Sequence, residues 1–433
     1  MLYSSLRSLK IHFIHAKPTQ VKGQKPKKVL PLLLMHGWPG TVREFYDFIP
    51  LLTTPSDKSD YVFEVIAPSL PGYGWSQGSS KTGFGVAQVA VVMRNLMLRV
   101  GFNKFLVQGG DWGSIIGSNV ASLFPENVLG YHSNMCGNNS PLGQIKLVLA
   151  SFFPSWFVDS QHASFYKGLG HMFSTILEEM GYAHIQASKP DTIGNALIDN
   201  PAGLAAYILE KFSTWTNPSF RSLPDGGLTK RFTYDQLLDN VMIYYVTNSI
   251  TTSVRLYSES MVASQFALAV DSLPIKAKSG CTRFAHEIVH TSDSVLANKF
   301  PNLVHSTHFS DGGHFPAFEL PQQLYDDFVS FVQKADFPVI LDLRSRYGVS
   351  VESKRDLHLE RVPTPVPTGC ARFKSDIMQF LDIQLQDKFT NLVHSTYHKQ
   401  GGHFAALEVP KVLYQDFIEF VKKVERKFRI KSL

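Results

Sequence analysis

The sequence is poor in cysteine, and this excludes several kinds of protein. Its 433 residues include three cysteines, Cys136, Cys281 and Cys370, which are too few and too widely spaced for a disulfide framework. None of them lies in a Cys-x-x-Cys or Cys/His pattern typical of a metal site. We therefore expect no bound metal, and a reducing compartment or a location facing the cytosol.

Long apolar runs are also absent. No stretch reaches the roughly 18 to 20 apolar residues that span a bilayer, and the longest candidate, residues 147–158, is interrupted by Pro154. The first residues, Met-Leu-Tyr-Ser-Ser-Leu-Arg, lack the uninterrupted apolar segment of a signal peptide. Taken alone, the chain is expected to be soluble.

Charge of one sign is not concentrated in any internal segment. The net charge is +6 and the pI about 9.0, but the basic residues are dispersed apart from clusters at 22–28 and 422–431. We interpret both clusters as solvated terminal segments, so no nucleic acid partner is expected. With 44% hydrophobic residues, the chain can form a sizeable core and an accessory domain.

Short β-like runs alternate with helical segments in the first third of the chain. The runs are Lys10–His15, Val29–Met35, Val62–Ala67 and Phe105–Gln108, and the apolar spacing in 84–100 predicts a buried helix. This alternation indicates an α/β fold with a mostly parallel sheet and crossover helices.

The rest of the chain divides by composition. Residues 135–258 are rich in Phe, Tyr and Trp and in helical patterns, as in a helical cap inserted into a core formed by 1–134 and 259–334. A linker, 335–362, precedes a final segment, 363–433.

That final segment is an internal repeat. Residues 274–334 recur as 363–423 at a constant offset of 89, with Cys-x-Arg-Phe and Gly-Gly-His-Phe in both copies. Two copies are too few for a solenoid. We infer a tandem duplication of the last strand and helix segment of the core.

A candidate nucleophile lies in Gly109-Gly110-Asp111-Trp112-Gly113, between a strand and a helical pattern. Small residues on both sides of the central one are typical of a nucleophile elbow, a sharp turn that exposes one side chain. The alternative interpretation is that Asp111 is only a helix N-cap.

The other members of a catalytic set follow in the order expected for this fold. The loop 36–40, His-Gly-Trp-Pro-Gly, lies where backbone N–H groups form half of an oxyanion hole. His314 and His403 each follow Gly-Gly, and each has a carboxylate 27 residues upstream, Glu287 or Asp376. Such a carboxylate orients a histidine so that it can take a proton from water.

These motifs resemble the microsomal epoxide hydrolases, and most of all their juvenile hormone epoxide hydrolase branch. The matching segments are HGWPG (36–40), EFYDFIPLLT (44–53), FEVIAPSLPGYGWS (63–76), GGDWGS (109–114), GYAHIQASKPDTIG (181–194), RLYSES (255–260), PTGCARF (367–373) and GGHFAALE (401–408). The resemblance covers nearly the whole chain from Ile11 onward.

The resemblance implies an α/β-hydrolase fold and the hydrolysis of an epoxide to a diol without metal or organic cofactor. Asp111 would be the nucleophile, Tyr182 and Tyr257 the proton donors, and Trp38 and Trp112 the backbone oxyanion donors. It also implies an apolar epoxide substrate, a role in hormone breakdown or detoxification, and attachment to the endoplasmic reticulum membrane.

The chain departs from the family pattern in two ways. Only 35 residues precede the HGWPG segment, so the family's long N-terminal region and its membrane anchor are expected to be largely missing. The acid and histidine segment is duplicated, although one nucleophile uses one histidine. We favour Glu287 and His314 over Asp376 and His403, because the first copy extends the sheet without a loop of 89 residues.

Two rival functions remain at this point. A haloalkane dehalogenase also uses an aspartate followed by Trp at the elbow, but it would not need the two tyrosines. A hormone- or lipid-binding pseudoenzyme, impaired by the extra segment, would retain the apolar cap. An assay of diol formation distinguishes both from an epoxide hydrolase.

Overall fold

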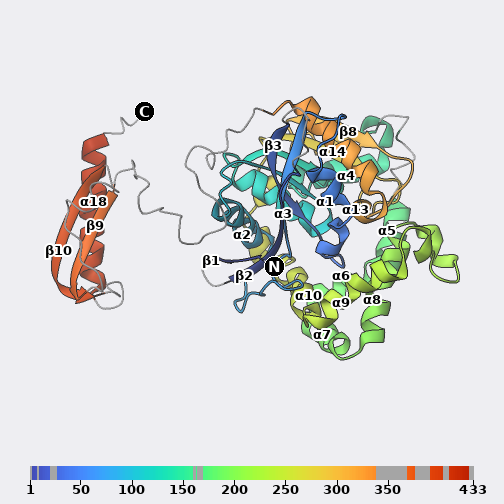
Figure 1. Cartoon of the computed structure of the whole chain (residues 1–433), viewed down its shortest axis with the longest axis horizontal. Coiled ribbons are helices and arrows are strands. Elements are labelled where there is room, and N and C mark those ends of the chain that lie inside the picture. Colours follow the sequence, from blue (N-terminus) through green and yellow to red (C-terminus); the bar gives the residue numbers. More distant parts are fainter. Residues whose placement is uncertain are drawn as a thin grey trace. The chain divides into compact units, whose positions relative to one another are not determined.

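The computed structural model divides the chain into two compact units, 1–341 and 342–433 (Figure 1). It describes residues 2–6, 9–19, 27–158, 162, 169–337, 368–375, 391–402 and 409–428.

The first unit is built on an eight-stranded sheet with the order β1-β2-β4-β3-β5-β6-β7-β8. The strands are β1 (Leu2–Leu6), β2 (Leu9–Ala16), β3 (Lys28–Met35), β4 (Tyr61–Pro68), β5 (Phe105–Gly109), β6 (Val128–Ser133), β7 (Lys278–Arg283) and β8 (Leu303–His308). From β4 to β8 all neighbours are parallel, which confirms the predicted mostly parallel sheet. The first predicted strand, β2, instead runs antiparallel to both β1 and β4, since a residue pattern does not record strand direction.

Helices cover both faces of the sheet, because its central strands alternate apolar side chains between two cores. Leu33 and Met35 of β3 pack with α2 (Val86–Arg99) and α3 (Asp111–Leu123). Leu32 and Leu34 pack on the opposite face with α1 (Phe48–Thr53) and α14 (Pro321–Ala335). The side chains of these three leucines and of Met35 are fully buried. Burying each of them stabilises the fold by roughly 1.5–3 kcal/mol.

A group of helices lies between β6 and β7 in the chain. They are α4 (Pro141–Phe152), α5 (Leu169–Glu179), α6 (Gly181–Ser188), α7 (Pro190–Ile198), α8 (Pro201–Thr214), α9 (Tyr234–Val246) and α10 (Ile250–Ser260). Proline at the first helical position favours the start of α4, α7 and α8. Figure 1 shows α6 to α10 gathered at one end of the unit, beside the sheet. We call α4 to α10 the cap.

Shorter helices complete the first unit. They are η1 (Val42–Phe45), η2 (Pro154–Trp156), η4 (Pro218–Ser222), η5 (Leu228–Lys230), α11 (Ala263–Phe266), η6 (Val270–Ser272), α12 (Asp293–Leu296) and α13 (Pro316–Glu319). Two of them, η1 and α13, flank the loops that carry the predicted oxyanion donor and histidine, and therefore help to position the site.

The structure corrects the expectation about cysteine. Cys136, which follows β6, and Cys281, on β7, form a disulfide with their Cα atoms 6.0 Å apart. They lie 145 residues apart in sequence and meet because β6 and β7 are neighbours in the sheet. The inference of a reducing compartment therefore loses its basis, while Cys370 is free.

The second unit contains β9 (Thr368–Ser375), β10 (Leu392–Gly402) and α18 (Pro410–Phe428). The two strands pair in parallel, as β7 and β8 do. The predicted alternative acid and base, Asp376 and His403, lie outside the described residues.

A buried aspartate on the last helix of each unit bonds to residues at repeat-related positions. Asp327 of α14 accepts from His305 (2.8 Å) and Thr307 (2.6 Å) of β8. Asp416 of α18 pairs with His394 (3.1 Å) of β10 and also accepts a hydrogen bond from Thr396. Burial would raise the pKa of each aspartate, but hydrogen bonds from these and neighbouring side chains lower it.

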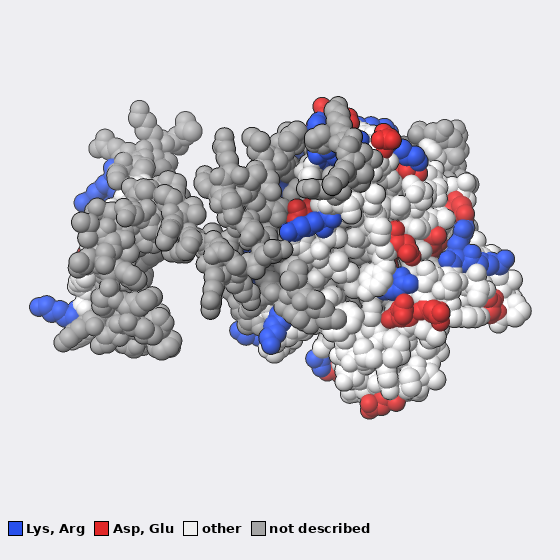
Figure 2. All heavy atoms as spheres, viewed as in Figure 1, with Lys and Arg blue, Asp and Glu red and all other residues white. Residues whose placement is uncertain are grey.

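Acidic and basic side chains are interspersed on the face of the first unit seen in Figure 2. No helix within the described ranges is both long and apolar enough to cross a membrane.

Candidate active site

Asp111 is the first residue of α3, directly after β5 and Gly110. Its φ angle is +48°, a left-handed conformation that costs a non-glycine residue of order 1–3 kcal/mol and is concentrated at functional sites. A Cβ at Gly113 would collide with the carbonyl oxygen of Met35, so the turn requires glycine there. These features are those of a nucleophile elbow.

The carboxylate of Asp111 does not cap its own helix. Its Oδ1 atom accepts a hydrogen bond of 2.8 Å from the backbone N–H of Trp38, in the HGWPG loop. A Cβ at Gly37 would overlap the Asp111 side chain, which explains a glycine at this position. The helix-cap interpretation of Asp111 is therefore wrong, and the predicted oxyanion donor Trp38 lies at the carboxylate.

The HGWPG loop is held from the cap by α9. The Asn240 amide donates to the carbonyl oxygen of Pro39 (2.9 Å), and the Tyr244 hydroxyl donates to that of Gly40 (2.7 Å). The other predicted oxyanion donor, Trp112, follows Asp111 in the first turn of α3, where backbone N–H groups have no partner within the helix.

The side chains of His314, Glu287 and Asp111 lie next to one another in the described structure. His314 Nε2 is 3.3 Å from Asp111 Oδ2, and His314 Nδ1 is 2.6 Å from Glu287 Oε1. Glu287 and His314 are buried, only 5% and 3% exposed, whereas Asp111 is half-buried. Burial alone would lower the pKa of His314, but the two carboxylates raise it well above its ordinary value.

The loop of His314 is fixed by two contacts that sequence reasoning missed. The His314 backbone N–H donates to the carbonyl oxygen of Trp215, at the end of α8 (2.9 Å). The Glu319 carboxyl accepts from the N–H groups of Gly313 (3.0 Å) and Phe315 (2.8 Å), and burial raises its pKa to about 8. The sequence offers only one indication of this contact, which is that Glu319 lies five residues after His314.

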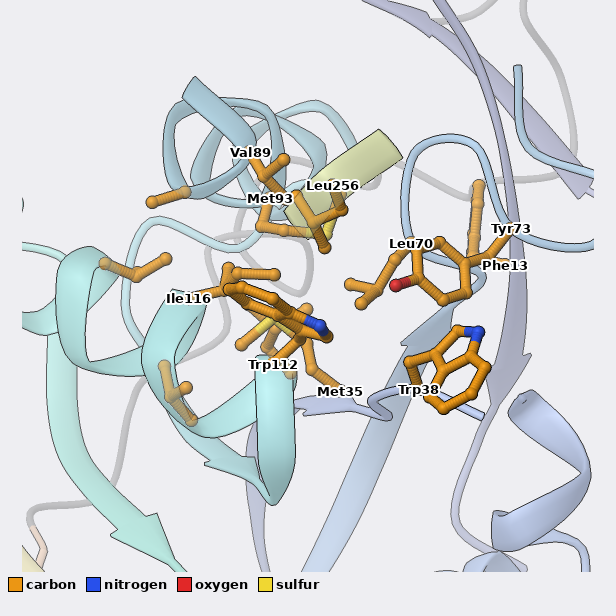
Figure 3. Close-up of a cluster of buried hydrophobic side chains, with 14 of the residues drawn as sticks. Phe13, Met35, Trp38, Leu70, Tyr73, Val89, Met93, Trp112, Ile116 and Leu256 are labelled. Atoms are coloured by element: carbon orange, nitrogen blue, oxygen red, sulfur yellow. The ribbon is translucent and has the colours of Figure 1, made fainter. Parts of the chain in front are cut away.

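Tyr182 of α6 and Tyr257 of α10 face the same region from the cap. The Tyr182 ring stacks on Trp38 at 5.2 Å, and the Tyr257 ring packs edge-on against Trp112 at 4.7 Å. The two tyrosine rings are 5.8 Å apart. Figure 3 shows Trp38 beside Tyr73, and Trp112 beside Ile116 and Met35 in the same hydrophobic cluster.

The electrostatics of the two tyrosines keep them protonated. Burial, first of all, raises the pKa of both hydroxyls, and the Asp111 carboxylate raises it further. Both hydroxyls therefore stay neutral in the resting site and are able to donate a hydrogen bond.

A cavity lined by cap residues includes Tyr182 in its lining. About 540 Å³ of it is open to the centre of a water-sized sphere, and its lining includes Glu178, Glu179, Glu210 and Arg221. Asp111 does not line it. We do not assign an apolar substrate to this cavity, because its lining is strongly charged.

The described residues contain no group of three or more His, Cys, Asp or Glu side chains that could hold a metal ion.

Comparison with known proteins agrees with this geometry. Residues 31–254 match the family model of the alpha/beta hydrolase fold, and residues 3–45 match that of the epoxide hydrolase N terminus. The chain is 53% identical over 331 residues to juvenile hormone epoxide hydrolase 1 of Ctenocephalides felis, covering 76% of this chain and 71% of the relative. It is 44% identical over 335 residues to epoxide hydrolase 1 of Oryctolagus cuniculus, covering 76% and 73%.

A solved structure gives the same result. The crystal structure of juvenile hormone epoxide hydrolase from the silkworm Bombyx mori superposes with a TM-score of 0.75 at 46% identity, covering 77% of this chain and 78% of that one. The fold, the predicted function and the relatives agree, and a dehalogenase or a binding protein is not favoured. The chain belongs to the epoxide hydrolases of the α/β-hydrolase fold.

Proposed function

We propose that this chain converts an apolar epoxide to a vicinal diol through an ester on Asp111, with His314 as general base, Glu287 as its orienting acid, and Tyr182 and Tyr257 as proton donors. The observation that carries the proposal is the position of the Asp111 carboxylate, between the Trp38 N–H at 2.8 Å and His314 Nε2 at 3.3 Å.

In the first step, Asp111 attacks a ring carbon of the epoxide. Its Oδ1 atom is held by Trp38, so Oδ2 is the oxygen that forms the new bond. The ring C–O bond breaks, and the departing oxygen takes a proton from Tyr182 or Tyr257. The raised pKa of these hydroxyls means that they give up the proton only when negative charge develops on the substrate.

Ester formation prepares the second step. It removes the charge of Asp111, which is one of the two carboxylates that raise the pKa of His314. The pKa of the imidazole then falls, so that more of it is in the neutral form that can take a proton at neutral pH. His314 is thus protonated in the resting enzyme and, once Asp111 is esterified, passes its proton to the tyrosinate left by the first step.

In the second step, water gives a proton to His314 and attacks Cγ of Asp111. The tetrahedral oxyanion forms on Oδ1, where the backbone N–H groups of Trp38 and Trp112 stabilise it. The Cγ–Oδ2 bond breaks, and the departing alcohol oxygen takes the proton from His314. The acid proton of Asp111 then passes to His314, which restores the resting enzyme, and the diol leaves.

The substrate is inferred from relatives. Proteins from Ctenocephalides felis, Bombyx mori and Manduca sexta with 46% identity or more are named juvenile hormone epoxide hydrolases. We infer that the substrate is such a hormone or a similar lipid or foreign epoxide. Location at the endoplasmic reticulum membrane is inferred from the family resemblance, and fractionation of cells expressing the full chain tests it.

The ester mechanism is tested with heavy-oxygen water. After many turnovers in H₂¹⁸O, we expect mass spectrometry to find the label in the Asp111 peptide, because the attacking water oxygen stays on the carboxylate. Asp111→Asn serves as the inactive control, as its amide is a poor nucleophile. An active enzyme whose Asp111 peptide remains unlabelled would contradict the mechanism.

A further inference from the structure

A small cavity lies beside Asp111. About 20 Å³ of it is open to the centre of a water-sized sphere, which is enough for an ordered water. Its lining includes Asp111, His314, Glu44 and Gln108. The first two have roles in the proposed mechanism, whereas Glu44 and Gln108 have none.

Gln108 presents an unused acceptor at this cavity. It lies on β5, three residues before Asp111, and its side chain is 1% exposed. Its amide nitrogen donates to Asn134 Oδ1 (3.1 Å), which fixes the orientation of the amide. The Oε1 atom is left buried without a hydrogen-bond partner. A buried acceptor without a partner is destabilising unless something donates to it.

Glu44 presents a second polar group. It lies on η1, four residues after the HGWPG loop, and is 8% exposed. Its Oε1 atom occupies the place that a Cβ at Gly40 would take, so the glycine at position 40 leaves room for the carboxyl. No partner for this carboxyl is found in the described part of the chain.

His314 supplies the third group. Its Nε2 atom is buried and makes no hydrogen bond of normal geometry, although Asp111 Oδ2 lies 3.3 Å away. A water in the cavity would therefore meet one base and two acceptors beside Asp111. Ordered buried waters typically make about three hydrogen bonds of this kind.

We propose that Glu44, with Gln108, is a further catalytic residue that binds the water which hydrolyses the Asp111 ester. The water donates one O–H to His314 Nε2, which later takes that proton. It donates the other O–H to the carbonyl oxygen of Glu44 or Gln108, and its lone pair points at Cγ of Asp111. This assignment rests on the proposed ester mechanism.

The charge state of Glu44 suits this role. Burial, first, and then the nearby Asp111 and Glu319 carboxylates raise its pKa to about 8, while His314 acts in the opposite direction. Tyr244, the other titratable neighbour, stays neutral because burial raises the pKa of its hydroxyl. At neutral pH Glu44 is thus an uncharged acid, which adds no repulsion to the oxyanion that forms on Asp111.

Rapid mixing of the full chain with styrene oxide, acid quenching and intact-mass measurement separate the two steps. Glu44→Leu should slow ester hydrolysis on the order of 10²-fold, because the water is no longer positioned, and leave ester formation unchanged. The alkylated enzyme then accumulates. Glu44→Gln should keep most of the hydrolysis rate, since its amide oxygen still accepts. Asp47→Asn, which removes an exposed carboxylate from the same segment, is the matched control.

The pH dependence of ester hydrolysis gives a second test. In the wild type the rate should fall as pH rises through the pKa of Glu44, which burial keeps above its ordinary value, because ionised Glu44 repels the developing oxyanion, and Glu44→Gln should lack this fall. If Glu44→Leu does not fold, the pH profiles of the wild type and Glu44→Gln still test the role of Glu44.

Two results would overturn the role of Glu44: ester hydrolysis at the wild-type rate in Glu44→Leu, or equal slowing of both steps. Failure of the ester mechanism itself looks different, because no alkylated enzyme would then appear even in His314→Gln.

Discussion

Asp111 combines a strained backbone with a carboxylate held on both sides. Its φ of +48° turns the side chain out of the strand-to-helix turn, and Trp38 and His314 contact different oxygens. One oxygen is thus kept for the oxyanion hole and the other for attack. The site therefore depends on the positions of individual atoms, and substitutions of single residues test it.

The identity of the base is tested by replacing each histidine in turn. His314→Gln should still form the ester but lose its hydrolysis by 10²-fold or more, the range of general base catalysis. His403→Gln should hydrolyse the ester at the wild-type rate. Quenched-reaction mass spectrometry measures both, and the opposite pair of results would transfer the base to His403.

The protonation of Glu44 should also appear in stability. Between its ordinary pKa of 4.5 and the raised value of about 8, the folded chain holds a proton that the unfolded chain has lost. Stability therefore falls as pH rises through this window and levels off above it.

Glu44→Gln removes this dependence. It should match the wild type near pH 5 and exceed it near pH 8, by on the order of a few kcal/mol. Urea unfolding at the two pH values measures the difference. A constant difference at both would show that Glu44 titrates normally.

At the scale of elements, the end of α8 contacts both a proposed proton donor and the proposed base. The Trp215 ring packs edge-on against both Tyr182 and His314, each at 5.0 Å. Its carbonyl oxygen also accepts from the His314 N–H. One turn of the cap therefore positions a proton donor and the base together.

Trp215→Ala should consequently destabilise the chain by about 3–5 kcal/mol, the usual cost of removing a buried tryptophan, and slow both chemical steps. Trp156→Ala is the matched control, because Trp156 is 73% exposed and its loss should change stability by less than about 0.5 kcal/mol. Thermal unfolding measures both. Equal effects of the two substitutions would contradict a positioning role for α8.

The sequence allowed elements to be predicted better than contacts. The strands β3, β4 and β5 follow from apolar runs, and the elbow of Asp111 follows from its small neighbours. Glu44 and Gln108 could not be predicted as partners, because they meet only where η1 and β5 come together. The Cys136–Cys281 pair had no local signal for the same reason.

At the scale of the whole molecule, the first unit contains a complete set of proposed catalytic groups. Asp111, His314, Glu287 and both tyrosines all lie within 1–341, with their own hydrophobic cores. The second unit repeats a strand, strand and helix arrangement, and nothing in the proposed mechanism requires it.

A chain ending at residue 341 should therefore fold and form diol at a rate close to that of the full chain. Circular dichroism and a diol assay on both chains provide the measurement. A truncated chain that folds but makes no diol would assign the second unit a part in catalysis.

The disulfide between Cys136 and Cys281 has a consequence for the cap. Cys136 precedes α4, and Cys281 follows α10 and the short helices α11 and η6. The bond therefore closes a covalent ring of which the cap is part. A protease that cuts any cap loop would leave a single molecule on a non-reducing gel and two fragments after reduction. The cap can thus be nicked without being released from the core.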